Sequence, residues 1–184
     1  MYIFKNLEAK ERIYKYWNHN LSGEAVCYII DKYFKDKEFE FVELGCQLAG
    51  LSDLVLHEFD KSEVVAIDIE NCNPEGIKYL QEIGLTDFLF IKGSSLNVYK
   101  EFNDNSIDFL YIDTDPHKED QLKQEILLWF PKVTQNGILA FHDYNHPLHP
   151  DVKKVVDEFC KNNNLELMFP NVDQQYYNVY FIKK

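Results

Sequence analysis

The chain has 184 residues, a length typical of one domain, and 46% of them are apolar and 15% aromatic, which excludes a disordered chain. Its formal net charge of −12 would repel a polyanion, so nucleic acid is excluded as a partner. No basic-then-apolar leader and no apolar run of membrane length is visible. We therefore expect a soluble cytoplasmic protein with no membrane partner.

Hydrophobic patterns predict helices and strands that alternate along the chain. The predicted helices lie at 22–34, 51–59, 74–84, 122–130 and 152–160. The predicted strands lie at 39–44, 64–69, 88–91, 107–112, 138–141, 165–169 and 176–182. The last two strands are joined too briefly for a helical crossover, so they should be antiparallel.

This alternation predicts a single α/β domain over residues 1–184, with N-terminal helices at 1–38 and a sheet core at 39–184. The expected core is a mostly parallel, seven-stranded sheet with an antiparallel C-terminal strand and helices on both faces. The first 20 residues carry Tyr14, Tyr16 and Trp17. Aromatic faces at helical spacing are mostly core, which favours a helix packed on the sheet over a lid or a homodimer contact.

Acids, small residues or a histidine follow five predicted strands in succession. In parallel α/β sheets, ligands bind beyond the carboxyl ends of the strands, near the switch in strand order. The groups that should share this rim are Glu43 and Gly45, Asp68 and Glu70, Gly93 to Ser95, Asp113 and Asp115, and His142 and Asp143.

The segment FVELGCQLAGLS (41–52) ends a strand in an acid and continues in a turn of small residues. Such a turn lets a ligand approach the backbone closely, although Gly45 and Gly50 alone also fit an ordinary tight turn. Asp68, at the end of the second strand, is placed to accept both hydroxyls of a ribose. Together these residues indicate a nucleoside-containing cofactor.

Glu43 discriminates between such cofactors. A carboxylate beside the turn would repel a pyrophosphate, whereas it suits a ligand with an ammonium group and a positively charged sulfur. S-adenosylmethionine therefore fits better than NAD. The sequence contains no G-x-x-x-x-G-K-[ST] motif, which excludes a P-loop nucleotide site.

The same segments resemble the class I S-adenosylmethionine-dependent methyltransferases. ELGCQLAG and AIDIE are similar to the first and second motifs of that family. The stretch IDTDPHKEDQLKQEILLWFPKVTQNGILAFHDY (112–144) resembles the small-molecule O-methyltransferase branch that includes macrocin O-methyltransferase and cephalosporin hydroxylase-like proteins. That branch usually reads I-D-G-D-H, a helix with Trp and Pro, G-G, a strand and H-D-Y. Here Pro116 is inserted, and Thr114 and Asn136 replace common glycines.

The resemblance implies a Rossmann-like fold and an enzyme of class EC 2.1.1 that methylates a small molecule, at a hydroxyl. It implies that the turn at 45–50 and Glu43 hold the methionine end of the cofactor, Asp68 the ribose and Ser94 the adenine side. The full set of expected cofactor contacts is Glu43, Gly45, Cys46, Gly50, Ser52, Asp68, Ile69, Gly93, Ser94, Ser95 and Asp113.

A second group of polar side chains suits a divalent cation. Asp113 and Asp143 end adjacent predicted strands, so their carboxylates can converge on a hard cation. By resemblance, metal-dependent relatives hold magnesium at the positions of Asp113, His142 and Asp143. Imidazole is a poor magnesium ligand and suits manganese, iron or zinc better. The alternative is that Asp113 contacts only the cofactor, while His142 and Asp143 bond to nearby backbone.

The catalytic candidates are Asp113, which faces the reaction centre, and Asp115 or His117, which would take the proton of the acceptor hydroxyl. His117 could equally be an ordinary surface residue. His149, in the loop NHPLHP, is interpreted as an ordinary polar loop residue rather than as one that lines the entrance for the methyl acceptor. Two other functions stay open: a protein of this fold that binds the cofactor without catalysis, and an NAD-linked oxidoreductase.

Overall fold

The computed structural model describes residues 2–6, 8, 11, 20–47, 49–70, 87–115, 117–172 and 177–184. The helix predicted at 74–84 and the aromatic residues Tyr14, Tyr16 and Trp17 lie outside the described residues.

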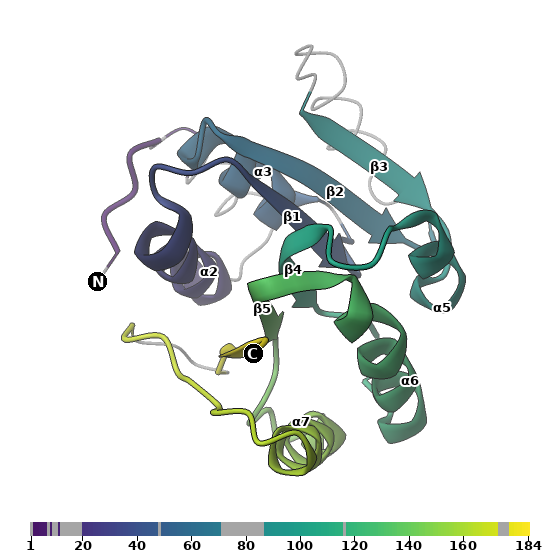
Figure 1. Ribbon diagram of the computed structural model, residues 1–184. Helices are drawn as coiled ribbons and strands as arrows, with labels where there is room; N and C mark the ends of the chain where they lie inside the picture. The colour runs from purple at the N-terminus through teal and green to yellow at the C-terminus, as the bar shows by residue number, and fades with distance from the viewer. Residues whose placement is uncertain are drawn as a thin grey trace.

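A mostly parallel sheet forms the centre of the molecule (Figure 1). Its strands are β1 (Phe39–Leu44), β2 (Ser62–Asp68), β3 (Phe88–Lys92), β4 (Ile107–Ile112), β5 (Val133–Phe141) and β6 (Val179–Ile182). Their order is β3-β2-β1-β4-β5-β6. The chain builds outward from β1 to β3 and then returns to the other side of β1 to add β4. The strand order therefore switches between β1 and β4, where ligands bind in such sheets.

The prediction of seven strands is wrong by one, because the sheet formed by the described residues has six. Segment 165–169 meets β6 only at an isolated antiparallel bridge between Met168 and Tyr180. Pro170 follows directly and has no N–H, so it cannot extend the ladder. The antiparallel C-terminal strand is confirmed, since β6 runs against β5.

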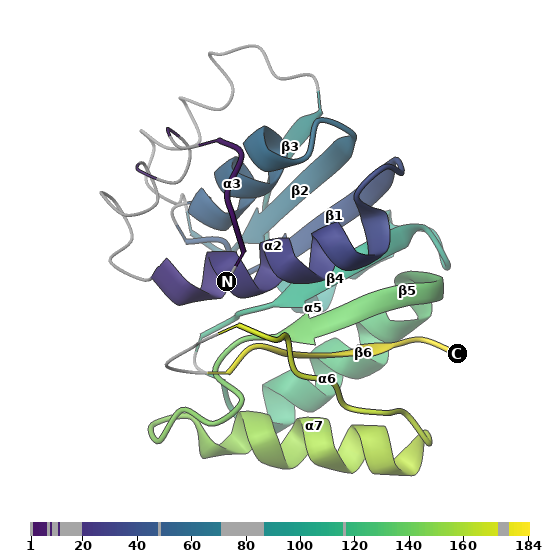
Figure 2. The same cartoon turned by 90° about the vertical axis from the view of Figure 1, so that its left-hand side faces the viewer.

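Helices cover both faces of the sheet, as predicted (Figures 1 and 2). On one face lie α2 (Asn20–Phe34) and α3 (Gly50–Glu58). On the other lie α5 (Ser95–Val98), α6 (Glu119–Trp129) and α7 (Pro150–Asn162), with the short 3-10 turns Tyr99–Glu101 and Phe130–Lys132. Within the described part of the chain, no helix has both the length and the apolar character needed to cross a membrane.

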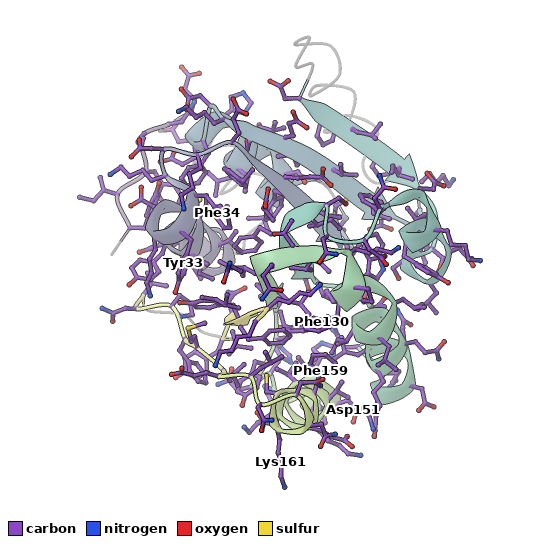
Figure 3. All side chains as sticks on the ribbon, in the orientation of Figure 1. Tyr33, Phe34, Phe130, Asp151, Phe159 and Lys161 are labelled. Carbon is purple, nitrogen blue, oxygen red and sulfur yellow. The ribbon has the colours of Figure 1, made fainter. Side chains whose placement is uncertain are left out.

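The two faces have separate hydrophobic cores because strand side chains alternate in direction. In β1, Phe41 packs with α2 and α3, whereas Val42 packs with the residues of α6 and α7. Figure 3 shows the same division at the periphery, with Phe34 of α2 on one side of the sheet and Phe159 of α7 on the other. The central strands β1 and β4 are thus buried on both faces, and the acids Glu43 and Asp113 lie at their carboxyl ends.

Candidate functional site

A cavity of about 670 Å³ lies at the carboxyl ends of the parallel strands, at the switch between β1 and β4. A volume of this size suits a small organic ligand. The predicted site residues in its wall are Glu43, Gly45, Asp68, Ile69, Gly93, Ser94, Ser95, Asp113, Asp115, His117 and His142. The fold therefore brings most of the predicted rim into one wall.

Four predicted site residues lie behind this wall rather than in it. Cys46 is fully buried, and Gly50 begins α3. Ser52 is also fully buried, and its hydroxyl donates a hydrogen bond of 2.5 Å to the Glu43 carboxylate. Asp143 is 7% exposed and lies next to His142. Of these four residues, Ser52 and Asp143 contact side chains of the wall, Glu43 and His142 respectively.

The turn after β1 lies directly against the end of β4. Gly45 has a φ of +82°, and a β-carbon there would lie 2.2 Å from the carbonyl oxygen of Asp113. Only glycine fits this position, because any side chain would displace the β4 end. Gln47 and Ala49 also have left-handed backbones, with φ of 43° and 56°. A non-glycine side chain in that region costs about 1–2 kcal/mol, so the turn holds its shape against local strain.

Asp68 connects this turn to the end of β2. One of its carboxylate oxygens accepts the backbone N–H of Gln47 at 2.9 Å, and the other accepts that of Glu70 at 3.0 Å. Each oxygen of an ionised carboxylate has a second lone pair. The geometry therefore leaves both oxygens able to accept a further hydrogen bond from a ligand in the cavity.

Glu43 is a buried acid in the cavity wall, with an exposed fraction of 2%. Burial raises the pKa of its carboxyl to about 8, and the charges of Asp113 and Asp68 act in the same direction, while the Ser52 hydrogen bond acts against them. Without a ligand, this carboxyl is mostly protonated at neutral pH. A cation bound beside it would restore the charged form.

Asp113, His142 and Asp143 form a compact ionic group at the ends of β4 and β5. The Nδ1 atom of His142 lies 3.2 Å from Oδ1 of Asp113 and 3.2 Å from Oδ1 of Asp143. Burial lowers the pKa of His142, but the two carboxylates outweigh it and raise that pKa to about 10. Burial also acts to raise the pKa of Asp143, but His117 and His142 hold it well below its usual range.

These three residues fit a divalent cation. Their donor atoms lie within 4.8 Å of one another. Among the described residues, Oδ1 of Asp143 is buried and accepts no hydrogen bond of good geometry, and the His142 imidazole lies 3.2 Å from it. Two carboxylates and an imidazole are ligands that divalent cations accept. The donor chemistry of these residues is thus compatible with the divalent cation that the resemblance implies, and the metal set stays a prediction.

The sequence favoured a surface position for His117 and an ordinary loop position for His149, and the structure places both elsewhere. The His117 side chain is only 8% exposed, so it is not an ordinary surface residue. His149 lies in the cavity wall rather than being mere loop polarity. Both face the carboxylate of Asp143. Their roles depend on how the loops after β4 and β5 fold together, which no local pattern reveals.

Glu125 is a structural residue of the site that the sequence reasoning missed. It is fully buried and accepts hydrogen bonds from Ser95 Oγ at 2.5 Å, Thr114 Oγ1 at 2.7 Å and Gln121 Nε2 at 3.2 Å. All three donors line the cavity. The sequence did indicate that Glu125 is buried, because it falls within the apolar stripe of α6 formed by Leu122, Ile126 and Trp129.

A family model described as a methyltransferase domain matches residues 42–144, more than half of the chain. The chain therefore belongs to this methyltransferase domain family. The resemblance to class I S-adenosylmethionine-dependent methyltransferases is confirmed by this match and by the fold. The matched segment holds the end of β1, the whole of β2, β3, β4 and β5, and the strand-end residues of the cavity. The sequence matches no curated protein at a significant level.

Solved structures share the fold at low sequence identity. A Staphylococcus aureus protein assigned as a caffeoyl-CoA O-methyltransferase superposes with a TM-score of 0.74 and 14% identity, covering 98% of this chain and 93% of its own. A methyltransferase from Podospora anserina, bound to S-adenosylhomocysteine (SAH), gives 0.72 and 12%, covering 97% and 87%. A Nostoc punctiforme protein assigned as an O-methyltransferase gives 0.69 and 10%, covering 95% and 60%.

Proposed function

We propose that this protein transfers the methyl group of S-adenosylmethionine to a hydroxyl of a small molecule. The observation that carries the proposal is the common wall of one cavity, in which Asp68, the turn from Glu43 to Gly45, and Asp113 lie together. These groups come from three neighbouring strands, β2, β1 and β4. Asp68 can accept hydrogen bonds from the ribose hydroxyls, and Glu43 is a buried acid that suits a cationic group. Asp113 is an acid at the end of the cavity where the methyl group would be transferred.

The cofactor would extend along the strand ends from β3 to β4. Asp68 would accept the ribose hydroxyls through its two free lone pairs. Ile69, which is 62% exposed, and Ser94 would border the adenine. Glu43 and the backbone of the turn would receive the methionine end, whose ammonium group would stabilise the charged form of the Glu43 carboxyl.

The acceptor would lie at the other end of the cavity, near Asp115, His117 and His149. Asp115 is exposed and able to accept the proton that the acceptor hydroxyl loses, with His117 as the alternative base. General-base catalysis contributes about 10²–10⁴-fold, and positioning contributes about 7–11 kcal/mol, so the shape of the cavity should lower the barrier more than the base does. Asp113, His142 and Asp143 would hold a divalent cation, which when bound lowers the pKa of a hydroxyl.

The cofactor assignment is tested by replacing Asp68 with alanine and measuring S-adenosylmethionine and SAH binding by calorimetry. Hydrogen bonds to a charged group contribute about 1.5–3 kcal/mol each, so losing two should weaken binding by about 100-fold or more. Asp60→Ala is the matched control, because Asp60 is an exposed aspartate in the turn before β2. Unchanged affinity in Asp68→Ala would refute the ribose assignment.

Two rival functions give different results. A non-catalytic binding protein would bind S-adenosylmethionine but show no methyl transfer to a panel of phenols, catechols and sugars. An NAD-linked oxidoreductase would be stabilised by NAD in a thermal-shift assay and not by SAH. The buried acid at Glu43 disfavours this second rival, because a pyrophosphate would lie beside a carboxyl rather than beside free amides.

A further inference from the structure

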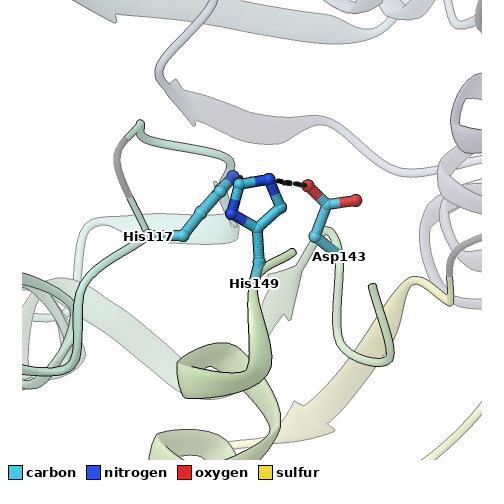
Figure 4. Close-up of side chains that lie close together, drawn as sticks. All are labelled: His117, Asp143 and His149. Carbon is cyan, nitrogen blue, oxygen red and sulfur yellow. Dashed lines mark ion pairs between the residues drawn. The ribbon is translucent and has the colours of Figure 1, made fainter. Parts of the chain in front are cut away.

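A second cluster of metal-type ligands lies beside the group just described. His117 follows β4, Asp143 follows β5 and His149 immediately precedes α7. Figure 4 shows both imidazole rings directed at the carboxylate of Asp143. The donor atoms of these three residues lie within 4.8 Å of one another.

The spacing of these atoms fits ligands of a shared ion better than a hydrogen-bonded network. Nε2 of His117 lies 3.4 Å from Oδ2 of Asp143, and Nε2 of His149 lies 3.8 Å from the same oxygen. N–H···O hydrogen bonds are usually about 2.7–3.2 Å long. Donor atoms about 2.1 Å from one ion are about 3.0 Å apart in an octahedron and about 3.4 Å apart in a tetrahedron. The two separations from Oδ2 would contract by up to about 0.4 Å around a tetrahedral ion and up to about 0.8 Å around an octahedral one.

The shared aspartate supplies an independent observation. Asp143 is 93% buried, as its exposed fraction is 7%, and its Oδ1 has no hydrogen-bond partner among the described residues. Its two oxygens face different histidines, Oδ1 toward His142 and Oδ2 toward His117 and His149. Buried carboxylates are ordinarily paired or bound to metal. Oδ1 thus faces His142, whereas Oδ2 faces His117 and His149 at distances longer than an ordinary hydrogen bond.

We propose that His117, Asp143 and His149 bind a late first-row divalent cation, such as Fe²⁺, Co²⁺ or Zn²⁺. This set shares Asp143 with the group of Asp113, His142 and Asp143, so the two groups are alternative sites for one ion. Two imidazoles and one carboxylate are softer than the oxygen ligands that Mg²⁺ requires, so this set selects against Mg²⁺. Three protein ligands leave coordination positions open toward the cavity, which His117 and His149 line. Oδ1 of Asp113 lies 3.6 Å from Nε2 of His117 and is an additional oxygen beside the set.

The site is tested by titrating the metal-free full-length protein with Co²⁺, followed by its visible ligand-field absorption, and with Zn²⁺ and Mg²⁺ by calorimetry. We expect one Co²⁺ or Zn²⁺ per chain and an affinity at least about 100-fold above that for Mg²⁺. His149→Gln and His117→Gln should each weaken Co²⁺ binding by about tenfold or more. His57→Gln is the control, because His57 pairs with Asp53 on α3, away from the cavity.

The proposal is overturned if both variants bind Co²⁺ as the parent protein does, or if Mg²⁺ binds as tightly as Co²⁺. It is also overturned if only His142→Gln lowers Co²⁺ affinity, since the ion would then lie between Asp113 and His142. Should His117→Gln fail to fold, His149→Gln decides alone, because the His149 side chain is 26% exposed. SAH binding is measured separately, so failure of the cofactor proposal leaves this test intact.

Discussion

Glu43 is the residue whose chemistry should change most when a ligand binds. Its raised pKa means that the folded protein binds more protons than the unfolded chain between the ordinary carboxyl pKa and about 8, so this group lowers stability as pH rises through that window. An adjacent cationic ligand should lower the pKa again. We therefore expect binding of S-adenosylmethionine at pH 7 to release roughly one proton from Glu43.

Calorimetry in buffers of different ionisation enthalpy measures this proton directly. The observed enthalpy should depend on the buffer at pH 7, where Glu43 is protonated before the ligand binds. Glu43→Gln should bind with a buffer-independent enthalpy. A parent protein with no buffer dependence at pH 7 would show that the ligand does not lie against Glu43.

Some residues of the site could be predicted because their place at the end of a strand is enough to locate them. Glu43, Asp68 and Asp113 directly follow or end apolar runs, and a parallel sheet necessarily gathers such residues at one edge. Glu125 and His149 were not predictable in the same way. Each reaches the site through packing between segments far apart in the chain, so its neighbours cannot be read from the local sequence.

At the scale of elements, α6 carries a buried acid that orders three parts of the cavity wall. Glu125→Ala would leave the hydroxyls of Ser95 and Thr114 without their acceptor, and we expect a loss of about 3 kcal/mol in the free energy of unfolding. Glu125→Gln keeps one acceptor oxygen and should lose less. Urea denaturation measures both, with Gln124→Ala on the exposed face of α6 as the control. Equal stability of Glu125→Ala and the control would contradict this role.

The elements themselves were predicted well where an internal pattern decides them. The apolar run 107–112 forms β4 with those bounds, and the stripe at 152–160 lies within α7. Segment 165–169 has a similar apolar character but forms no strand of the sheet. A strand depends on a partner edge and on continued N–H donors, and Pro170 removes the next donor. Apart from that proline, the sequence pattern does not show whether a segment will find a partner strand or keep its N–H donors.

At the scale of the whole molecule, residues 2–6 tie the start of the chain to α2 and α3. The carboxylate of Glu58, 4% exposed, accepts hydrogen bonds from Tyr2 Oη and from the backbone N–H groups of Lys5 and Asn6. We expect Glu58→Ala to release this segment and to lower the free energy of unfolding by about 2–4 kcal/mol.

Hydrogen exchange followed by mass spectrometry distinguishes this release from a general loss of stability. Amides of residues 2–6 should exchange much faster in Glu58→Ala, while those of β4 and β5 keep their protection relative to the global stability. Glu63→Ala, which removes an exposed acid on β2, is the control. Unchanged exchange at residues 2–6 would show that Glu58 does not hold the segment.

The close approach of Gly45 to the carbonyl of Asp113 has a consequence for how the two ends of the cavity communicate. One ligand would bind the turn, and another would bind beyond Asp113, yet the backbones of the two regions touch with no space for a single methyl group. Displacement on one side is therefore passed to the other. Affinities at the two ends should be thermodynamically linked, and such linkage is reciprocal: whatever the first occupant does to the second, the second does equally to the first.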